Sequence, residues 1–150
     1  MSERRLTVAM VAGMPYPMAK ASVIRVHHIV SALTERYPDV RVKVFAYQGS
    51  DPGPPHPQVD LHLVGGFDRD KTRYYSWGNK LAADWKLIRE LMRRRDEFDV
   101  IHCHTIEGLF IAQAFRLLAR RRTPVCIDVH GPIVAEMVHY GLIPDWKPVV

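Results

Sequence analysis

The segment FDVIHCHTIEGLFIAQAFRLLARRRTPVCIDVHGP, residues 98–132, is the part of the sequence that indicates the fold most clearly. It contains two short apolar runs, Val100–Cys103 and Val125–Val129, on either side of a stretch with helical periodicity. Apolar runs of this length that alternate with a helical pattern are typical of parallel strands joined by a crossover helix.

Histidines stand where both runs end. His102 and His104 close the first run, and His130 follows the second. Ligands of open parallel sheets bind beyond the carboxyl ends of the strands. We therefore expect a functional site at the edge that these histidines mark.

The rest of the chain repeats the same alternation. The apolar patterns predict strands at Leu6–Ala12, Val40–Tyr47 (half exposed) and Val59–Val64 (near a sheet edge), and helices from an N-cap at Ser22 and from Leu81 to about Arg95. The stretches 13–21 and 51–57 contain prolines and are expected to be loops. The sequence therefore predicts an α/β fold with a doubly wound, Rossmann-like, mostly parallel sheet. Its expected strand order is 3-2-1-4-5, with right-handed crossovers.

Each predicted helix has an apolar face. The expected core-facing residues are Val23, Val26, Ile29, Val30 and Leu33 in the first helix, and Leu81, Trp85, Ile88, Leu91 and Met92 in the second. Pro132 favours a further helix immediately after residue 131.

The 150 residues correspond to about one domain, 1–150. The 47% hydrophobic and 25% charged content are typical of a globular protein, and no apolar run reaches the length of a membrane span. The N-terminal apolar run is short and lacks a cleavage pattern, so we interpret it as a strand. Cys103 and Cys126 lie within apolar runs, which favours unpaired cysteines and a cytoplasmic location.

The net charge of +5 is concentrated in two segments, Arg89–Arg95 and Arg116–Arg122. Both lie at the ends of helical patterns, where cations stabilise the helix dipole. Attraction to an anionic membrane surface, at the inner face, or to phosphate is the alternative. No aromatic–basic motif accompanies the charge, so no nucleic-acid partner is expected.

Two nucleotide-binding motifs are absent after the first strand. The sequence there is GMPYPMAKAS, residues 13–22, which has neither the glycine spacing of a dinucleotide fingerprint nor that of a Walker loop. We therefore expect no NAD-type cofactor.

His130, Gly131 and Pro132 are the strongest candidate residues. Gly131 would let a ligand approach the backbone, and the N-terminus of a following helix favours an anion. A histidine at this position can donate a hydrogen bond to a leaving phosphate or bind an acceptor hydroxyl. The alternative is that His130 only caps a helix.

Three other groups of residues also have candidate roles. Arg25, in the first turn after Ser22, can bind a phosphate or carboxylate with two hydrogen bonds. The polar–aromatic stretch 69–77 could bind an acceptor or a lipid surface, or pack locally. His102 and His104 are expected on one face, where they could ligate a metal together with His130, Asp128 or Cys126.

The chain resembles the N-terminal domain of GT-B retaining glycosyltransferases of the family 4 (group 1) type. Four stretches carry the resemblance: VAMVAGMPYP (8–17), ASVIRVHHIVSALTERYPDVRVKVF (21–45), FDVIHCHTIEGLFIAQAF (98–115) and TPVCIDVHGP (123–132). In this family, two Rossmann-like domains face a cleft. The N-terminal domain holds the acceptor, and the C-terminal domain holds the nucleotide sugar.

The resemblance implies roles for particular residues. His130 would contact the sugar or acceptor near the reacting centre, as the catalytic residue, and His104 and Thr105 would line the acceptor pocket. Gly13 and Ser22 would approach the donor diphosphate. Many members carry a Gly-Gly pair before the first helix. This chain has Ala21-Ser22 instead, which leaves less room for a phosphate.

The resemblance also implies a reaction. The full-length protein would transfer a sugar from a nucleotide-sugar donor to a small-molecule or glycan acceptor, with retention and without a metal or other cofactor. A C-terminal donor-binding domain is expected, and residues 1–150 alone are expected to be inactive. The alternatives are an epimerase-like GT-B protein, a non-catalytic Rossmann-like binding module and a metal hydrolase.

Overall fold

The computed structural model describes residues 5–16, 21–49, 57–66 and 77–129. Strands and helices alternate along the chain, in the order β1 (Thr7–Tyr16), α1 (Ala21–Arg36), β2 (Arg41–Gln48), β3 (Val59–Gly66), α2 (Trp77–Arg93), β4 (Val100–His104), α3 (Thr105–Ala119) and β5 (Val125–Asp128). None of the helices in these ranges is both long and apolar enough to cross a membrane.

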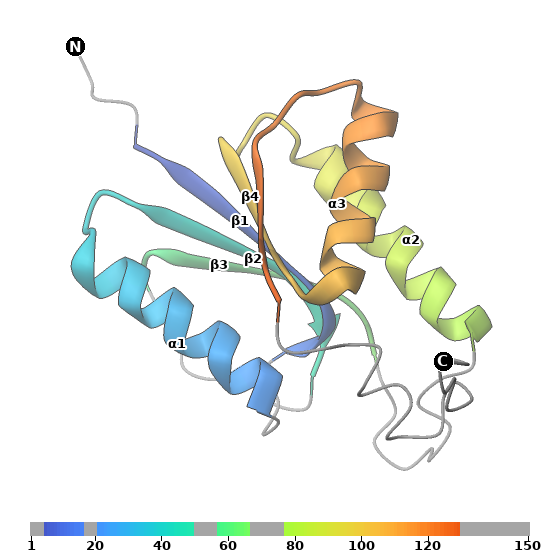
Figure 1. The fold of residues 1–150 in the computed structure, drawn as a ribbon, viewed down its shortest axis with the longest axis horizontal. Coiled ribbons are helices and arrows are strands. Elements are labelled where there is room, and N and C mark those ends of the chain that lie inside the picture. Colours follow the sequence, from blue (N-terminus) through green and yellow to red (C-terminus); the bar gives the residue numbers. More distant parts are fainter. Residues whose placement is uncertain (1–4, 17–20, 50–56, 67–76, 130–150) are drawn as a thin grey trace, which may run out of the picture.

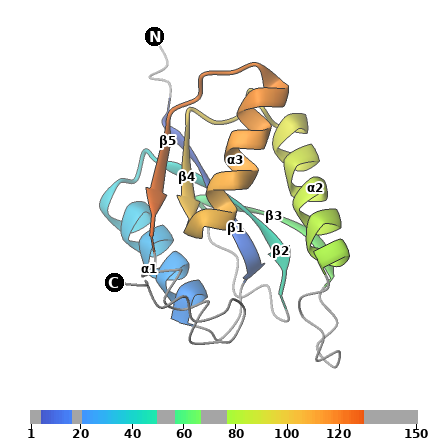
Figure 2. The same cartoon turned by 45° about the vertical axis from the view of Figure 1, so that its right-hand side comes forward.

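The five strands form one sheet in the order β3-β2-β1-β4-β5, and every neighbouring pair is parallel (Figures 1 and 2). This confirms the predicted fold class and strand order. At the carboxyl ends, His104 of β4 lies in register with Ala12 of β1 and with Asp128 of β5. The polar residues that end these strands therefore lie at one edge of the sheet.

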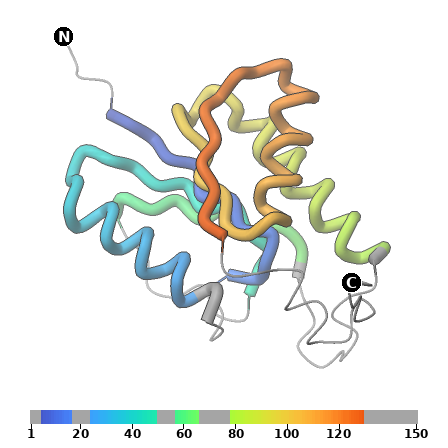
Figure 3. Tube along the Cα trace, in the orientation of Figure 1, coloured from blue at the N-terminus to red at the C-terminus, as the bar shows by residue number. Residues whose placement is uncertain are grey.

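Helices cover both faces of the sheet. The tube trace shows α1 on one side and α2 with α3 on the other (Figure 3). One core packs beneath α1 and contains Met10, Val26 and Val44, while the other packs beneath α2 and α3 and contains Phe45 and Phe115. Successive β1 residues enter opposite cores, which explains why this strand is an unbroken apolar run.

Helix α3 lies unusually close to β1. A Cβ atom at Gly108 would be 2.5 Å from the carbonyl oxygen of Val11, and one at Gly13 would be 2.8 Å from Cβ of Glu107. Real Cβ atoms do not approach other heavy atoms so closely. Glycine at these positions therefore sets the distance between the first turn of α3 and the end of β1.

Two predicted element boundaries differ from the structure. The stretch from Gly13 to Tyr16 is strand rather than loop, because β1 continues to pair with β2 after a register shift. Pairing with β4 ends at Ala12, so Pro15 has one neighbouring strand, as prolines in edge strands do. Helix α1 begins at Ala21, which places Ser22 inside the first turn rather than at the N-cap.

The buried faces of two elements also differ from the prediction. In α2, the buried stripe includes Ala83, Leu87 and Leu91, spaced four residues apart, whereas Leu81 and Trp85 are exposed. The small side chain of Ala83 fits against the sheet where a larger one was expected. Strand β2 is mostly buried rather than half exposed, because α2 covers the face that carries Phe45 and Tyr47.

Candidate functional site

His104 ends strand β4 and has no exposed surface. Its Nδ1 atom lies 3.7 Å from a carboxylate oxygen of Asp128 on the neighbouring strand. The two residues are in register, so strand pairing itself brings the imidazole and the carboxylate together. A carboxylate at this position favours a proton on Nδ1 and so helps to set the orientation of the ring.

Arg25 of α1 holds the same carboxylate. Its Nε and one terminal nitrogen donate hydrogen bonds of 2.7 Å to the two oxygens of Asp128. The Asp128 side chain is only 14% exposed, whereas that of Arg25 is 54% exposed and reaches the carboxylate from the solvent side. The hydrogen bonds to Asp128 raise the pKa of Arg25 further above its ordinary value. Asp128 therefore joins β5, through Arg25, to the first turns of α1.

His102 lies next to His104 on the same face of β4. The two ring centroids are 4.7 Å apart with an interplanar angle of 34°, which confirms the predicted common face. His102 is half-buried. Among the described residues, no group of three histidine, cysteine, aspartate or glutamate side chains is placed to hold a metal ion. His130, the third histidine of the metal alternative, lies outside the described residues.

Thr105 begins α3 directly after His104 and has a backbone φ of 63°. A positive φ is rare for a β-branched residue and costs roughly 1–3 kcal/mol. Backbone strain of this kind is concentrated at functional sites, where the surrounding structure maintains it. The strained turn places Thr105 at the edge of the sheet where His104 and Asp128 meet.

The other predicted site residues are placed as follows. Gly13 lies in β1, one residue beyond the pairing with His104, and packs against the first turn of α3. The backbone of Ser22 lies in the first turn of α1. His130 and Gly131 lie outside the described residues. Their roles, like the binding roles of Gly13, Ser22, Arg25, His104 and Thr105, stay predictions.

Sequence reasoning considered Asp128 only as a metal ligand and missed its ion pair with Arg25. One signal was present, since Asp128 is a polar residue at the end of an apolar strand, two residues before His130. Its partner is 103 residues away, so only the fold reveals the pair.

The cysteines are free, as predicted. Cys103 is fully buried, and burial raises the pKa of its thiol to about 12. Such a thiol is protonated at neutral pH and is not a nucleophile. Cys126 is exposed, and its pKa is also raised, mainly by desolvation.

Comparison with protein families gives a match. The family model described as a glycosyl transferase 4-like domain matches residues 21–149. This range includes α1, β4, α3 and β5, the elements that hold Arg25, His104, Thr105 and Asp128. A search of the curated proteins found no match.

Proposed function

Because the chain belongs to the family of glycosyl transferase 4-like domains, we propose that it forms the acceptor side of a site that transfers a sugar from a nucleotide-sugar donor, with retention. The acceptor is a small molecule or a glycan. We further propose that a C-terminal domain binds the nucleotide sugar across a cleft from the edge that contains His104 and Asp128.

The observation that best supports this proposal is the arrangement of Arg25, Asp128 and His104. The ion pair connects three elements, α1, β5 and β4, at the carboxyl edge of the sheet, where ligands of open α/β sheets bind. It also fixes the segment that follows Ser22 relative to the strand that precedes His130. These two segments are the proposed donor-phosphate and catalytic parts of the site.

Each residue in the proposed site has a simple chemical task. His130 donates a hydrogen bond near the reacting centre, and Gly131 leaves room for the acceptor beside it. Thr105 and the exposed face of Arg25 contact acceptor hydroxyls or charges, and the fully buried His104 supports them by positioning the Asp128 carboxylate. Gly13 and Ser22 lie near the donor diphosphate, where backbone N–H groups stabilise negative charge as the nucleotide leaves. Catalysis then depends on positioning and electrostatic stabilisation, without a cofactor.

The test is a transfer assay with the whole protein that contains this domain. The protein is incubated with a panel of nucleotide sugars and candidate acceptors, and the products are analysed by mass spectrometry. NMR of the product then gives the anomeric configuration. We expect transfer from at least one donor, with the anomeric configuration of that donor retained. Hydrolysis, epimerisation or inversion instead of transfer with retention would refute the proposal.

A further inference from the structure

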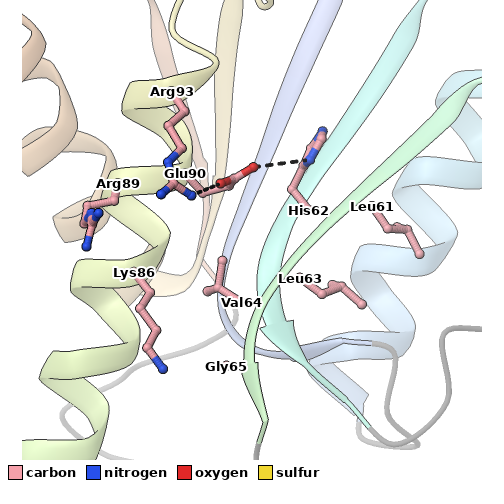
Figure 4. A pocket seen from close by; sticks show the side chains of 9 residues that line it. All are labelled: Leu61, His62, Leu63, Val64, Gly65, Lys86, Arg89, Glu90 and Arg93. Carbon is pink, nitrogen blue, oxygen red and sulfur yellow. Dashed lines mark hydrogen bonds and ion pairs between the residues drawn. The ribbon is translucent and has the colours of Figure 1, made fainter.

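A groove of about 480 Å³ lies between α2 and the outermost strand, β3, which is separated from β4 and its histidines by β2 and β1. Residues Leu61–Gly65 form one wall, and side chains of α2 form the other (Figure 4). Within the described part of the chain, β3 pairs only with β2, so its other edge has no strand partner there.

The backbone groups of β3 that face the groove can be identified from the pairing. The carbonyl of Gln58 accepts a 2.9 Å hydrogen bond from the N–H of Val42 on β2. Backbone groups alternate between the two edges of a strand, so even-numbered residues face β2. Leu61 and Leu63 therefore present their N–H and C=O groups to the outer edge.

The α2 wall carries an excess of positive charge. Lys86, Arg89 and Arg93 line the groove, and Glu90 is the only acidic residue among the described residues of its lining. Glu90 already pairs with Arg94 at 2.7 Å and with Arg93 at 3.3 Å. Lys86 and Arg89 have no acidic partner among the described residues. Lys86 lies over the end of β3, since a Cβ atom at Gly65 would be 3.7 Å from its Nζ.

The opposite side of β3 is apolar. The side chains of Leu61 and Leu63 point away from α2 (Figure 4), toward the core beneath α1, and both are half-buried. A strand added to this edge would thus have cations beside one of its faces and leucines beside the other.

We propose that this groove binds an extended acidic peptide segment of a protein partner, which adds to the sheet as a strand beside β3. Peptides that bind in this way gain main-chain hydrogen bonds from the edge and specificity from alternate side chains. The segment recognised would alternate acidic residues, directed at α2, with apolar residues beside Leu61 and Leu63.

The spacing of the groups fits this arrangement. At 1.5 Å per residue, Lys86 and Arg93 are roughly 10 Å apart along α2. Alternate side chains of a strand are roughly 7 Å apart. Two or three acidic residues in alternate positions therefore extend over the length of α2 that carries the cations. The long, flexible side chains of Lys86 and Arg93 make up for the mismatch between the two spacings.

A peptide fits these walls better than the alternative occupants. A phosphate group accepts hydrogen bonds and would leave the outward carbonyls of Leu61 and Leu63 without a donor. A second copy of this chain that paired through β3 would bring two α2 helices to one face of a continuous sheet, where their cations repel each other. An anionic membrane surface is flat and does not enter the groove between α2 and the strand edge.

The experiment measures binding of a fluorescein-labelled, acetylated peptide of five Glu-Val repeats to the protein by fluorescence anisotropy. The Lys86→Glu/Arg89→Glu double variant should weaken binding at least tenfold. Both residues are exposed, so the fold should persist. Arg36→Glu/Arg122→Glu, which changes the net charge equally at two exposed sites elsewhere, is the matched control and should leave binding unchanged. Two further peptides are N-methylated at alternate residues, one at the Glu positions and the other at the Val positions. Only one of them should lose binding, because an added strand forms hydrogen bonds to β3 through only one of its two edges.

Three results would overturn the proposal. They are absence of peptide binding, equal binding by the wild-type protein and the double variant, and equal binding of both N-methylated peptides. Inorganic phosphate and vesicles with anionic lipid are tested in parallel. The groove is a general anion site rather than a peptide site if phosphate or the vesicles displace the peptide completely and also fail to bind the double variant.

Discussion

Arg25 in helix α1 and Asp128 at the end of strand β5 are 103 residues apart in the chain and form two hydrogen bonds of 2.7 Å each. Asp128 also lies 3.7 Å from the buried imidazole of His104. One carboxylate thus connects a helix and two strands at the carboxyl edge of the sheet. Because it precedes His130 by two residues, its position affects the segment proposed to carry catalysis.

The first prediction concerns this ion pair. Arg25→Lys keeps the charge but cannot form the two parallel hydrogen bonds of a guanidinium. We expect the rate of sugar transfer in the whole protein to fall about tenfold, since small misplacements of catalytic groups have large effects on rate. Arg36→Lys, at an exposed site in the same helix, is the control and should retain the full rate. If Arg25→Lys matches the control in kcat and KM, the ion pair has no positioning role.

The second prediction concerns Gly108. A methyl group there would be 2.5 Å from the carbonyl oxygen of Val11, so Gly108→Ala should lower the free energy of unfolding by about 2 kcal/mol or more. Gly78→Ala in α2 is the matched control, because a Cβ atom there meets nothing within 4 Å. Helix propensity should make that variant neutral or slightly more stable. Equal effects of the two substitutions in urea denaturation would contradict the close packing of α3 on β1.

The third prediction concerns Lys43, whose ammonium lies 3.0 Å from both Asp60 and Glu97. Its hydrogen bonds lower the pKa of each carboxylate below the ordinary value. A carboxylate with a lowered pKa stabilises the fold above its ordinary pKa, near 4, and this contribution is lost as the pH falls through the folded-state value.

Lys43→Met should therefore reduce the free energy of unfolding at pH 7 by about 1 kcal/mol, a small effect because solvent screens both carboxylates. The difference from wild type should disappear near pH 2, and Lys43→Arg should preserve most of the stability. Unfolding curves measured across this pH range test the prediction. A difference that stays constant from pH 7 to pH 2 would exclude the linkage.

The fourth prediction concerns the two cysteines. Cys103 is fully buried with a pKa raised to about 12, whereas Cys126 is exposed. Under native conditions at pH 8, iodoacetamide should modify Cys126 and leave Cys103 intact, as peptide mass mapping would show. In denaturant, both should react. Equal modification of both cysteines in the native protein would be inconsistent with a buried β4.

The fold class could be predicted from the sequence because short apolar runs alternate with helical patterns, as in parallel sheets with crossover helices. Val100–Cys103 and Val125–Val129 are such runs, and histidines mark their ends, although Cys126 and Ile127 of the second run are exposed. The extension of β1 to Tyr16 could not be predicted, because the prolines in this stretch favour a loop and only pairing with β2 maintains the strand.

Parts of the core and of the site depend on tertiary contacts that no local pattern contains. Trp85 is one of the two tryptophans of α2, yet it is exposed, while the smaller Ala83 faces the sheet. The pairing of Arg25 with Asp128 joins positions that no local pattern relates. A first-turn arginine and a strand-end aspartate were both recognisable as candidates for polar contacts, but the sequence does not show that they meet.

The proposed catalytic role of His130 is tested by comparing sugar transfer by the whole protein and by its His130→Ala variant, with His28→Ala as the control. His28 is an exposed histidine of α1 and is not part of the proposed site. We expect His130→Ala to lower kcat at least a hundredfold with unchanged thermal stability, while His28→Ala transfers sugar at the wild-type rate. A His130→Ala variant with wild-type turnover would contradict this role.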